Sequence, residues 1–135
     1  MTAIVVSLLT IAVACVSFAP WVPMRNKDLK RIFKLADLKQ GEIFYDLGCG
    51  TGKVIMYANK NFKAKTIGVE LALPLFLICK IRWIFNGDKN LFFKFGNLFK
   101  EDLRKADAVY IYGMPHTIKN KLREKLEKEL KPVAR

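Results

Sequence analysis

The chain has 135 residues, which is enough for one domain of ordinary size and too few for two. Its 52% hydrophobic content can form a packed core and excludes a disordered chain. Lys and Arg number 24 against 12 Asp and Glu, so the formal net charge is +12, which bears on partners and not on fold.

The first predicted element is an uncharged apolar segment. No charged side chain occurs from Met1 to Val22, and the run from Ala3 to Ala19 is near the lower length limit for a helix that crosses a hydrocarbon layer of ~30 Å. Trp21 follows as an interfacial aromatic residue. Five basic residues come next: Arg25, Lys27, Lys30, Arg31 and Lys34. By the positive-inside rule, we expect a single-pass membrane protein with an anchor at residues 1–22 and a domain at residues 23–135 on the cytoplasmic side.

Two alternatives for the apolar segment stay open. A cleaved signal peptide would use Ser17 and Ala19 as the small residues before the cut. Against it, no Lys or Arg precedes the apolar stretch, and Pro20 directly follows the cut. A buried core helix is the other alternative. We favour the membrane anchor.

Beyond Pro20, stretches with helical spacing alternate with short apolar strands. Helices are predicted at 27–38, 53–60, 73–85 and about 117–130, and strands at 43–47, 66–69, 92–95 and 108–112. This alternation predicts an α/β fold, in which crossover helices connect the strands of a parallel sheet. The strongly apolar helix at 73–85 carries Lys80 and Arg82 and could rest on a membrane, but we expect it to be covered on both sides.

The C-terminal end of the chain is expected to leave the sheet incomplete. Pro132 stops the last helix, and Val133 has the character of the start of a fifth strand. A parallel sheet of four strands would leave one edge open, so we expect a fold that is truncated at its C-terminal end.

A glycine-rich loop (DLGCGTG) extends from Asp46 to Gly52, between the first strand and the next helix. Glycines let the backbone turn sharply and approach a ligand where a Cβ would clash. A phosphate-binding P-loop is excluded, because Leu47 stands where its first glycine belongs and Val54 where its Ser or Thr belongs. A dinucleotide loop would read G-x-G-x-x-G, whereas this one reads G-x-G-x-G.

Acidic residues at two strand ends indicate the ligand. A carboxylate at Asp46, just before the glycines, would repel a pyrophosphate but suits a ligand with an ammonium and a sulfonium group. S-adenosylmethionine (SAM) is such a ligand. Glu70 ends the second strand and can accept hydrogen bonds from both ribose hydroxyls. Asn97 follows the third strand and can meet an adenine edge with its amide. The alternatives are a helix N-cap for Glu70 and a turn residue for Asn97.

These residues resemble those of class I SAM-dependent methyltransferases. The loop DLGCGTG, followed by IGVE at 67–70, is similar to motif I of that family and the motif after it. The segments PWVP at 20–23, GNLF at 96–99 and YGMP at 112–115 resemble a narrower group. That group is the small protein-lysine methyltransferases, which include archaeal broad-specificity enzymes and the mitochondrial enzyme acting on the ATP synthase c-subunit. The resemblance covers most of the chain from Pro20 onward.

The resemblance implies a Rossmann-like sheet, SAM as cofactor and further strands on the acceptor side that this sequence lacks. The candidate cofactor-binding residues are Asp46, Gly48, Cys49, Gly50, Gly52, Glu70 and Asn97. We expect Cys49 to be a small loop residue and not a nucleophile, because nothing nearby in the sequence offers a base. The resemblance also implies that residues 20–23 pack over the cofactor.

A second set of residues is expected to line the channel for the methyl acceptor. The candidates are Tyr112, Gly113, Met114 and Pro115, with Tyr112 orienting the acceptor amine. The single histidine, His116, is expected to be a loop or capping residue and not a base. Three widely spaced cysteines and one histidine offer neither a disulfide framework nor a zinc site.

The sequence therefore predicts a SAM-dependent methyltransferase, with a protein lysine near the cytoplasmic surface of a membrane as the favoured acceptor. Basic residues next to the apolar segment favour lipid over nucleic acid, and the RNA-recognition type of aromatic and basic strand motif is absent from the sequence. The alternatives are an RNA or small-molecule methyltransferase of the same fold, and a SAM-binding membrane module without activity.

Overall fold

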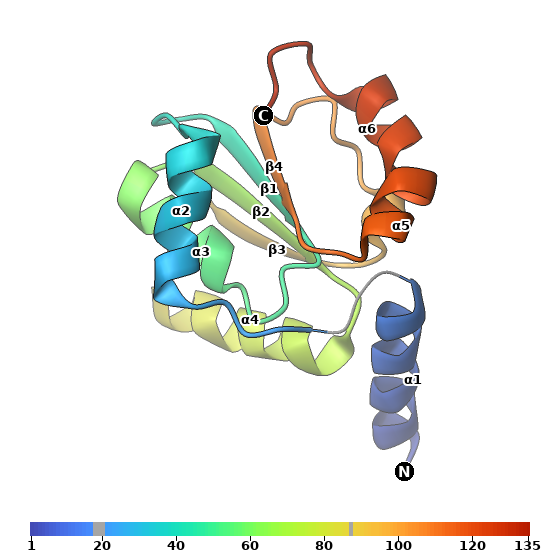
Figure 1. Ribbon diagram of the computed structural model, residues 1–135. Coiled ribbons are helices and arrows are strands. Elements are labelled where there is room, and N and C mark those ends of the chain that lie inside the picture. Colours follow the sequence, from blue (N-terminus) through green and yellow to red (C-terminus); the bar gives the residue numbers. More distant parts are fainter. Residues whose placement is uncertain (18–20, 87) are drawn as a thin grey trace.

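The computed structural model describes residues 1–17, 21–86 and 88–135 (Figure 1). Its centre is a sheet of four parallel strands in the spatial order β3-β2-β1-β4. The strands are β1 (Ile43–Leu47), β2 (Lys65–Glu70), β3 (Leu91–Phe95) and β4 (Ala108–Ile111). Each agrees with its predicted range to within one residue at either end, because a parallel strand that is buried on both faces is a short continuous apolar run. The predicted α/β sheet with crossover helices is confirmed.

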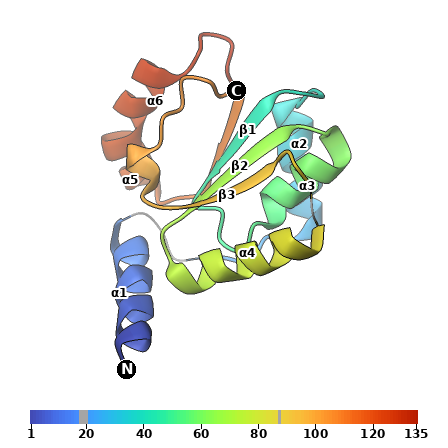
Figure 2. The same ribbon diagram turned by 180° about the vertical axis from the view of Figure 1, so that it is seen from behind.

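Helices α2 (Asn26–Ala36) and α3 (Lys53–Phe62) cover one face of the sheet (Figures 1 and 2). Leu29 and Phe33 lie four residues apart on α2 and are both buried, while the other face of this helix is charged. The Phe33 ring lies 5.4 Å from the Phe44 ring of β1 and 5.1 Å from the Phe62 ring at the end of α3. An aromatic cluster thus holds α2 against the sheet at the start of the chain's α/β portion.

The opposite face is covered by the last helical segment. The single helix predicted at 117–130 is α5 (Pro115–Thr117), a π-helical turn (Ile118–Leu122) and α6 (Arg123–Glu129). The predicted apolar stripe is confirmed, because its members pack in one hydrophobic cluster with buried strand residues such as Leu47 and Val69. The members of the stripe are Ile118, Leu122, Leu126 and Leu130. A short 3₁₀ turn (Leu98–Lys100) follows β3 and also packs into this cluster through Leu98.

The N-terminal helix α1 (Thr2–Ser17) has 16 residues and projects away from the sheet (Figure 1). At 1.5 Å per residue it is about 24 Å long, which is shorter than a hydrocarbon layer of ~30 Å. Within the described parts of the chain, no helix has both the length and the apolar character needed to cross a membrane. The predicted membrane-spanning helix is therefore not supported. Residues 18–20 of the predicted anchor lie outside the described residues.

Helix α4 (Leu73–Asn86) connects β2 to β3 and packs against both strands. It was expected to be covered on both sides, and this expectation is wrong. Only Cys79 of this helix is buried, and large apolar side chains on the opposite face are exposed. Gly87, which follows the helix, lies outside the described residues.

The outer edge of β4 has a backbone partner in the last residue of the chain. The Arg135 N–H donates to the Asp107 carbonyl oxygen at 3.0 Å, and the Arg135 carbonyl oxygen accepts from the Val109 N–H at 2.8 Å. This is the hydrogen-bond pattern of a parallel neighbour. The start of a fifth strand was expected at Val133, but the described residues form no strand there, and Arg135 is the residue that pairs with β4.

Candidate active site

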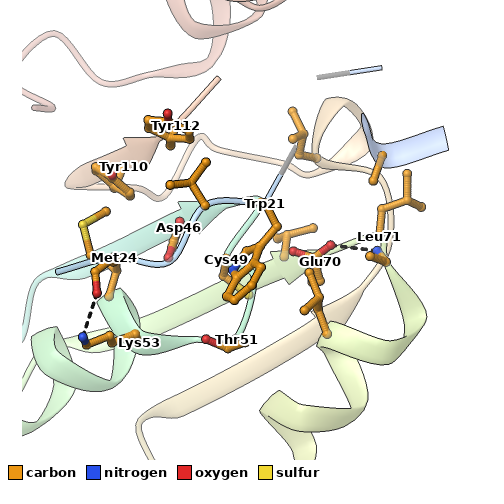
Figure 3. A pocket seen from close by; sticks show the side chains of 18 of the residues that line it. Trp21, Met24, Asp46, Cys49, Thr51, Lys53, Glu70, Leu71, Tyr110 and Tyr112 are labelled. Atoms are coloured by element: carbon orange, nitrogen blue, oxygen red, sulfur yellow. Dashed lines mark hydrogen bonds between the residues drawn. The ribbon is translucent and has the colours of Figure 1, made fainter. Parts of the chain in front are cut away.

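A cavity of about 1040 Å³ lies at the carboxyl ends of β1, β2 and β4 (Figure 3). The chain passes from β1 to β2 on one side and from β3 across to β4 on the other side of β1. In an open parallel sheet, ligands bind at the crevice where the strand order reverses in this way. Besides strand ends and loops, the walls include residues of α1, α2 and the segment between them.

The glycine loop forms the floor of this cavity. Gly48, Gly50 and Gly52 all adopt a positive φ, of 84°, 57° and 77°. A Cβ at Gly50 would lie 2.4 Å from Cδ1 of Trp21, and one at Gly52 would lie 2.5 Å from Cε1 of Phe93. Glycine is required at these two positions by backbone conformation and by close approach together, as the sequence predicted.

Asp46 stands at the end of β1 and lines the cavity, although only 2% of its surface is exposed. Burial, followed by the negative charge of Glu70, raises the pKa of Asp46 well above its usual range. The Glu70 carboxylate at the neighbouring strand end thus disfavours ionisation of Asp46. A cationic group placed beside Asp46 would relieve this repulsion, which is the environment that an ammonium or sulfonium ligand needs.

Two backbone N–H groups hold the Glu70 carboxylate, one in the glycine loop and one just after β2. Its Oε2 accepts from the Gly50 N–H at 2.7 Å, and its Oε1 accepts from the Ala72 N–H at 2.7 Å, just before α4. Burial raises the pKa of Glu70, while these hydrogen bonds oppose the shift. Each carboxylate oxygen has a second acceptor position. Glu70 can therefore hold the backbone just before α4 and accept ribose hydroxyls at the same time.

Asn97 also combines the two roles that the sequence left open. Its Oδ1 accepts from the Phe99 N–H at 2.9 Å and so caps the 3₁₀ turn, while the residue lines the cavity. With the oxygen used in the cap, the side-chain NH₂ is the group that Asn97 offers to a base edge.

Tyr112 lines the cavity from the end of β4, whereas the three residues after it do not. Gly113, Met114 and Pro115 lead away toward α5, with Pro115 as its first residue. His116 is exposed beyond them, and its Nδ1 lies 3.4 Å from Oγ1 of the adjacent Thr117. The structure thus brings Tyr112 to the cofactor residues and separates Gly113–Pro115 from this cavity.

Cys49 is a buried residue of the glycine loop, and its thiol is not in a reactive environment. A hydrogen bond with the Cys79 thiol, together with burial, raises the pKa of Cys49 well above its usual range. The thiol of Cys79 in turn donates to the Gly50 carbonyl oxygen at 3.0 Å. Cys49 therefore keeps its proton, and the hydrogen bond from Cys79 ties the loop to α4. Among the described residues, no cluster of His, Cys, Asp or Glu is suited to hold a metal ion.

Tyr110 belongs to the cavity wall, although the sequence analysis did not name it as a candidate. It pairs with Asp46 in the β1–β4 register and lines the cavity. Burial, followed by the charge of Asp46, raises the pKa of Tyr110 to about 12, so its phenol keeps its proton and can donate it. Its alternation with Tyr112, which places both rings on one face of the strand, was the available signal.

The segment after α1 closes the cavity over the loop. The Trp21 side chain lies against Gly50 of the glycine loop (Figure 3). Lys53, at the start of α3, donates from Nζ to the Met24 carbonyl oxygen at 2.7 Å and holds the segment in place (Figure 3). The expectation that residues 20–23 pack over the pocket is met by Trp21, Val22 and Pro23, which line it. Pro20 lies outside the described residues.

Comparison with known proteins agrees with this geometry. Residues 46–135, which begin at Asp46, match the family described as the ANTKMT methyltransferase domain. The chain belongs to this family. It is a SAM-dependent methyltransferase.

The relatives of this chain differ in the methyl acceptors that their names give. A protein-lysine N-methyltransferase of Saccharolobus islandicus is 35% identical over 127 residues, which are 89% of this chain and 75% of that protein. An RNA methyltransferase from Salinibacter ruber, solved with S-adenosylhomocysteine, is 30% identical with a TM-score of 0.76, over 82% of this chain and 72% of that one. A methyltransferase from Geobacter sulfurreducens, also solved with S-adenosylhomocysteine, shares the fold at 17% identity, with a TM-score of 0.72 over 93% of this chain and 52% of that one.

Proposed function

We propose that this methyltransferase transfers methyl groups to the side-chain amine of protein lysines. The observation that carries the proposal is the 35% identity with a protein-lysine N-methyltransferase over nearly the whole chain. The aromatic wall that Tyr110, Tyr112 and Trp21 build around the cavity supports it, because such a wall suits a long aliphatic side chain with an amine at its end.

SAM supplies an electrophilic methyl group on a sulfonium. The residues of the chain then have two tasks: to hold cofactor and acceptor in line and to exclude water. A free lysine amine has a pKa of ~10.4 and is protonated in water, so it must lose a proton before its nitrogen can attack the methyl carbon. Desolvation among Tyr110, Tyr112 and Trp21 lowers that pKa. The Tyr112 hydroxyl is the group that we assign to orienting the neutral amine.

Methylation is tested with methyl-labelled SAM and a mixture of proteins, followed by identification of the labelled residues. Label on lysine that is lost in Asp46→Ala supports the proposal. Tyr112→Phe should retain cofactor binding but methylate more slowly, whereas Tyr57→Phe, a phenol on α3 that does not line this cavity, should leave the rate unchanged.

RNA is the second candidate acceptor, and two observations favour considering it. The Salinibacter ruber structure is that of an RNA methyltransferase, and this chain carries a net charge of +12. The same labelling with total RNA distinguishes the two: label on RNA alone, with binding that weakens steeply as salt is raised, would contradict the lysine proposal.

We further propose that the enzyme works at the cytoplasmic face of a membrane, with α1 as its point of attachment. The exposed apolar side chains of α1 and the basic residues that follow it support this location. Attachment of this kind needs insertion of apolar side chains into one leaflet and not a span. Fractionation of cells that express the chain, with and without residues 1–17, tests the location independently of methylation.

A further inference from the structure

The outer face of α4 is an apolar surface without a partner among the described residues. Its exposed members are spaced three and four residues apart and so form one stripe: Leu77, Ile78, Ile81, Ile84 and Phe85. Ile84 is 68% exposed and Phe85 84%. A crossover helix whose only purpose was to cover the sheet would carry polar residues here, as α2 does.

Helix α1 continues this apolar surface. The Leu73 N–H at the start of α4 donates to Oγ1 of Thr10 at 3.2 Å, so the start of α4 lies beside the C-terminal half of α1. From that junction, α1 extends away from the body while α4 runs across the end of it, as both views show (Figures 1 and 2). The exposed apolar residues of α1 include Ile4, Val5, Leu8, Leu9 and Val13.

The charge on these two helices has one sign. Within its helical range α1 has no charged side chain, and α4 has two basic residues, Lys80 and Arg82, and no acidic one. Lys80 is exposed and lies 4.9 Å from the centre of the Trp83 ring. A lysine beside a tryptophan at the margin of an apolar face is the arrangement found where a helix lies in the headgroup layer of a membrane.

We propose that the α4 stripe is a docking surface for a bilayer that contains anionic lipid. A flat protein partner would meet α4 but would leave α1 projecting past it, whereas a bilayer can accept α4 in its interface and α1 in its interior. A second copy would bring two chains of net charge +12 together, which opposes association. Anionic headgroups are attracted to the same charge. The inference rests on the proposed membrane location and adds the orientation of the enzyme on the membrane.

Docking through both helices fixes where the cavity faces. Pro74 and Leu75 at the start of α4, and Ile11 and Ala14 of α1, line the cavity. The part of the cavity wall that these helices form therefore lies close to the lipid surface, and the docked enzyme can rotate only about the bilayer normal.

The first test measures binding of the full chain to phosphatidylcholine vesicles with and without phosphatidylglycerol. Ile84→Gln/Phe85→Gln should weaken binding to the anionic vesicles about tenfold or more, because apolar contacts carry interfacial binding. The matched control is Phe92→Gln/Val133→Gln, which changes exposed residues (42% and 80%) that belong to neither helix and do not line the cavity. The control should bind as the parent does. Equal weakening in both doubles would overturn the proposal.

A second readout separates α4 from α1. With both native tryptophans replaced by Phe, a tryptophan introduced by Phe85→Trp should shift its emission to the blue and resist quenching by acrylamide when anionic vesicles are added. A tryptophan introduced by Val133→Trp in the same background should do neither. If vesicles bind but the Phe85→Trp probe remains accessible, α1 alone is the attachment, and the α4 proposal fails while the membrane location stands.

Two further outcomes also overturn the inference. Failure to bind any vesicle removes the membrane location together with the docking surface, while lysine methylation in vesicle-free solution tests the proposed reaction separately. Concentration-dependent dimers in sedimentation, abolished by Ile84→Gln/Phe85→Gln, would assign the face to a second copy of the chain.

Discussion

Asp46 combines deep burial with a second carboxylate nearby, and both raise its pKa. The folded chain thus holds the Asp46 proton more tightly than the unfolded chain. Stability from this residue is complete at pH values below the unfolded pKa and declines as pH rises through the window up to the raised folded pKa. A cationic ligand has the opposite preference, because it favours the carboxylate. Asp46 therefore lowers the stability of the ligand-free protein at neutral pH, and we expect it to favour binding of a cationic ligand.

Asp46→Asn should stabilise the ligand-free chain at neutral pH and weaken SAM binding by an order of magnitude or more, since hydrogen bonds to charged groups contribute ~1.5–3 kcal/mol. Urea unfolding and calorimetric titration measure the two effects. In the parent, SAM affinity should rise with pH because binding releases the Asp46 proton, and this dependence should be absent in Asp46→Asn. A SAM affinity independent of pH in the parent would contradict the role given to Asp46.

Glu70→Ala should cost about 2 kcal/mol or more of unfolding free energy, because it leaves the N–H groups of Gly50 and Ala72 without their carboxylate acceptor. SAM affinity should fall as well, since the loop and the ribose lose the same group. Glu70→Gln keeps one acceptor oxygen and should lie between Glu70→Ala and the parent in both measurements. A Glu70→Gln variant as weak as Glu70→Ala would show that the negative charge, and not the acceptor geometry, is what the loop requires.

At the scale of elements, the segment that begins at Trp21 is part of the site although it precedes the family match. It lies over a loop whose glycines adopt positive φ and leave room for the Trp21 ring. Gly50 permits the contact, and Lys53 on the next helix holds the segment through the Met24 carbonyl.

Gly50→Ala should destabilise the chain by about 1–2 kcal/mol through backbone strain at positive φ, with an added loss from the contact between the new Cβ and Trp21. Trp21→Ala removes that contact but not the strain. The double variant should therefore lose less unfolding free energy than the sum of the single variants, as measured in urea. Strict additivity would show that Trp21 does not rest on the loop. Gly41→Ala is the control, because Gly41 shares the positive φ but has open space at the Cβ position.

Considered as a whole, the molecule carries far more positive than negative charge. Its described ion pairs, such as Lys131 with Asp107 and Arg135 with Glu42, join the C-terminal segment to the sheet region. Self-repulsion at net charge +12 destabilises the compact state, and salt screens it.

The thermal midpoint should therefore rise as sodium chloride is increased from very low to physiological ionic strength. An uncharged osmolyte at matched osmolality serves as the control for changes in solvation. A midpoint that falls over this range would show that the surface ion pairs outweigh the repulsion.

The sheet was predictable from the sequence because buried parallel strands are short apolar runs followed by glycine or acidic residues. The grouping of the candidate cofactor residues in one cavity was predictable for the same reason, since Asp46, Glu70 and Asn97 stand at or just after strand ends. The place of Tyr110 in the cavity wall was not predictable, because it depends on the register of Tyr110 with Asp46. The exposure of α4 was not either, since an apolar helix looks the same in sequence whether a neighbour covers it or not. Trp21 was expected over the cofactor only from resemblance.

Helix α1 and Trp21 share one cavity wall. Ile11 and Ala14 of the helix line the cavity, and so does Trp21, whose ring lies against Gly50. Any force that repositions the first helix therefore also reshapes the space left for the nucleoside.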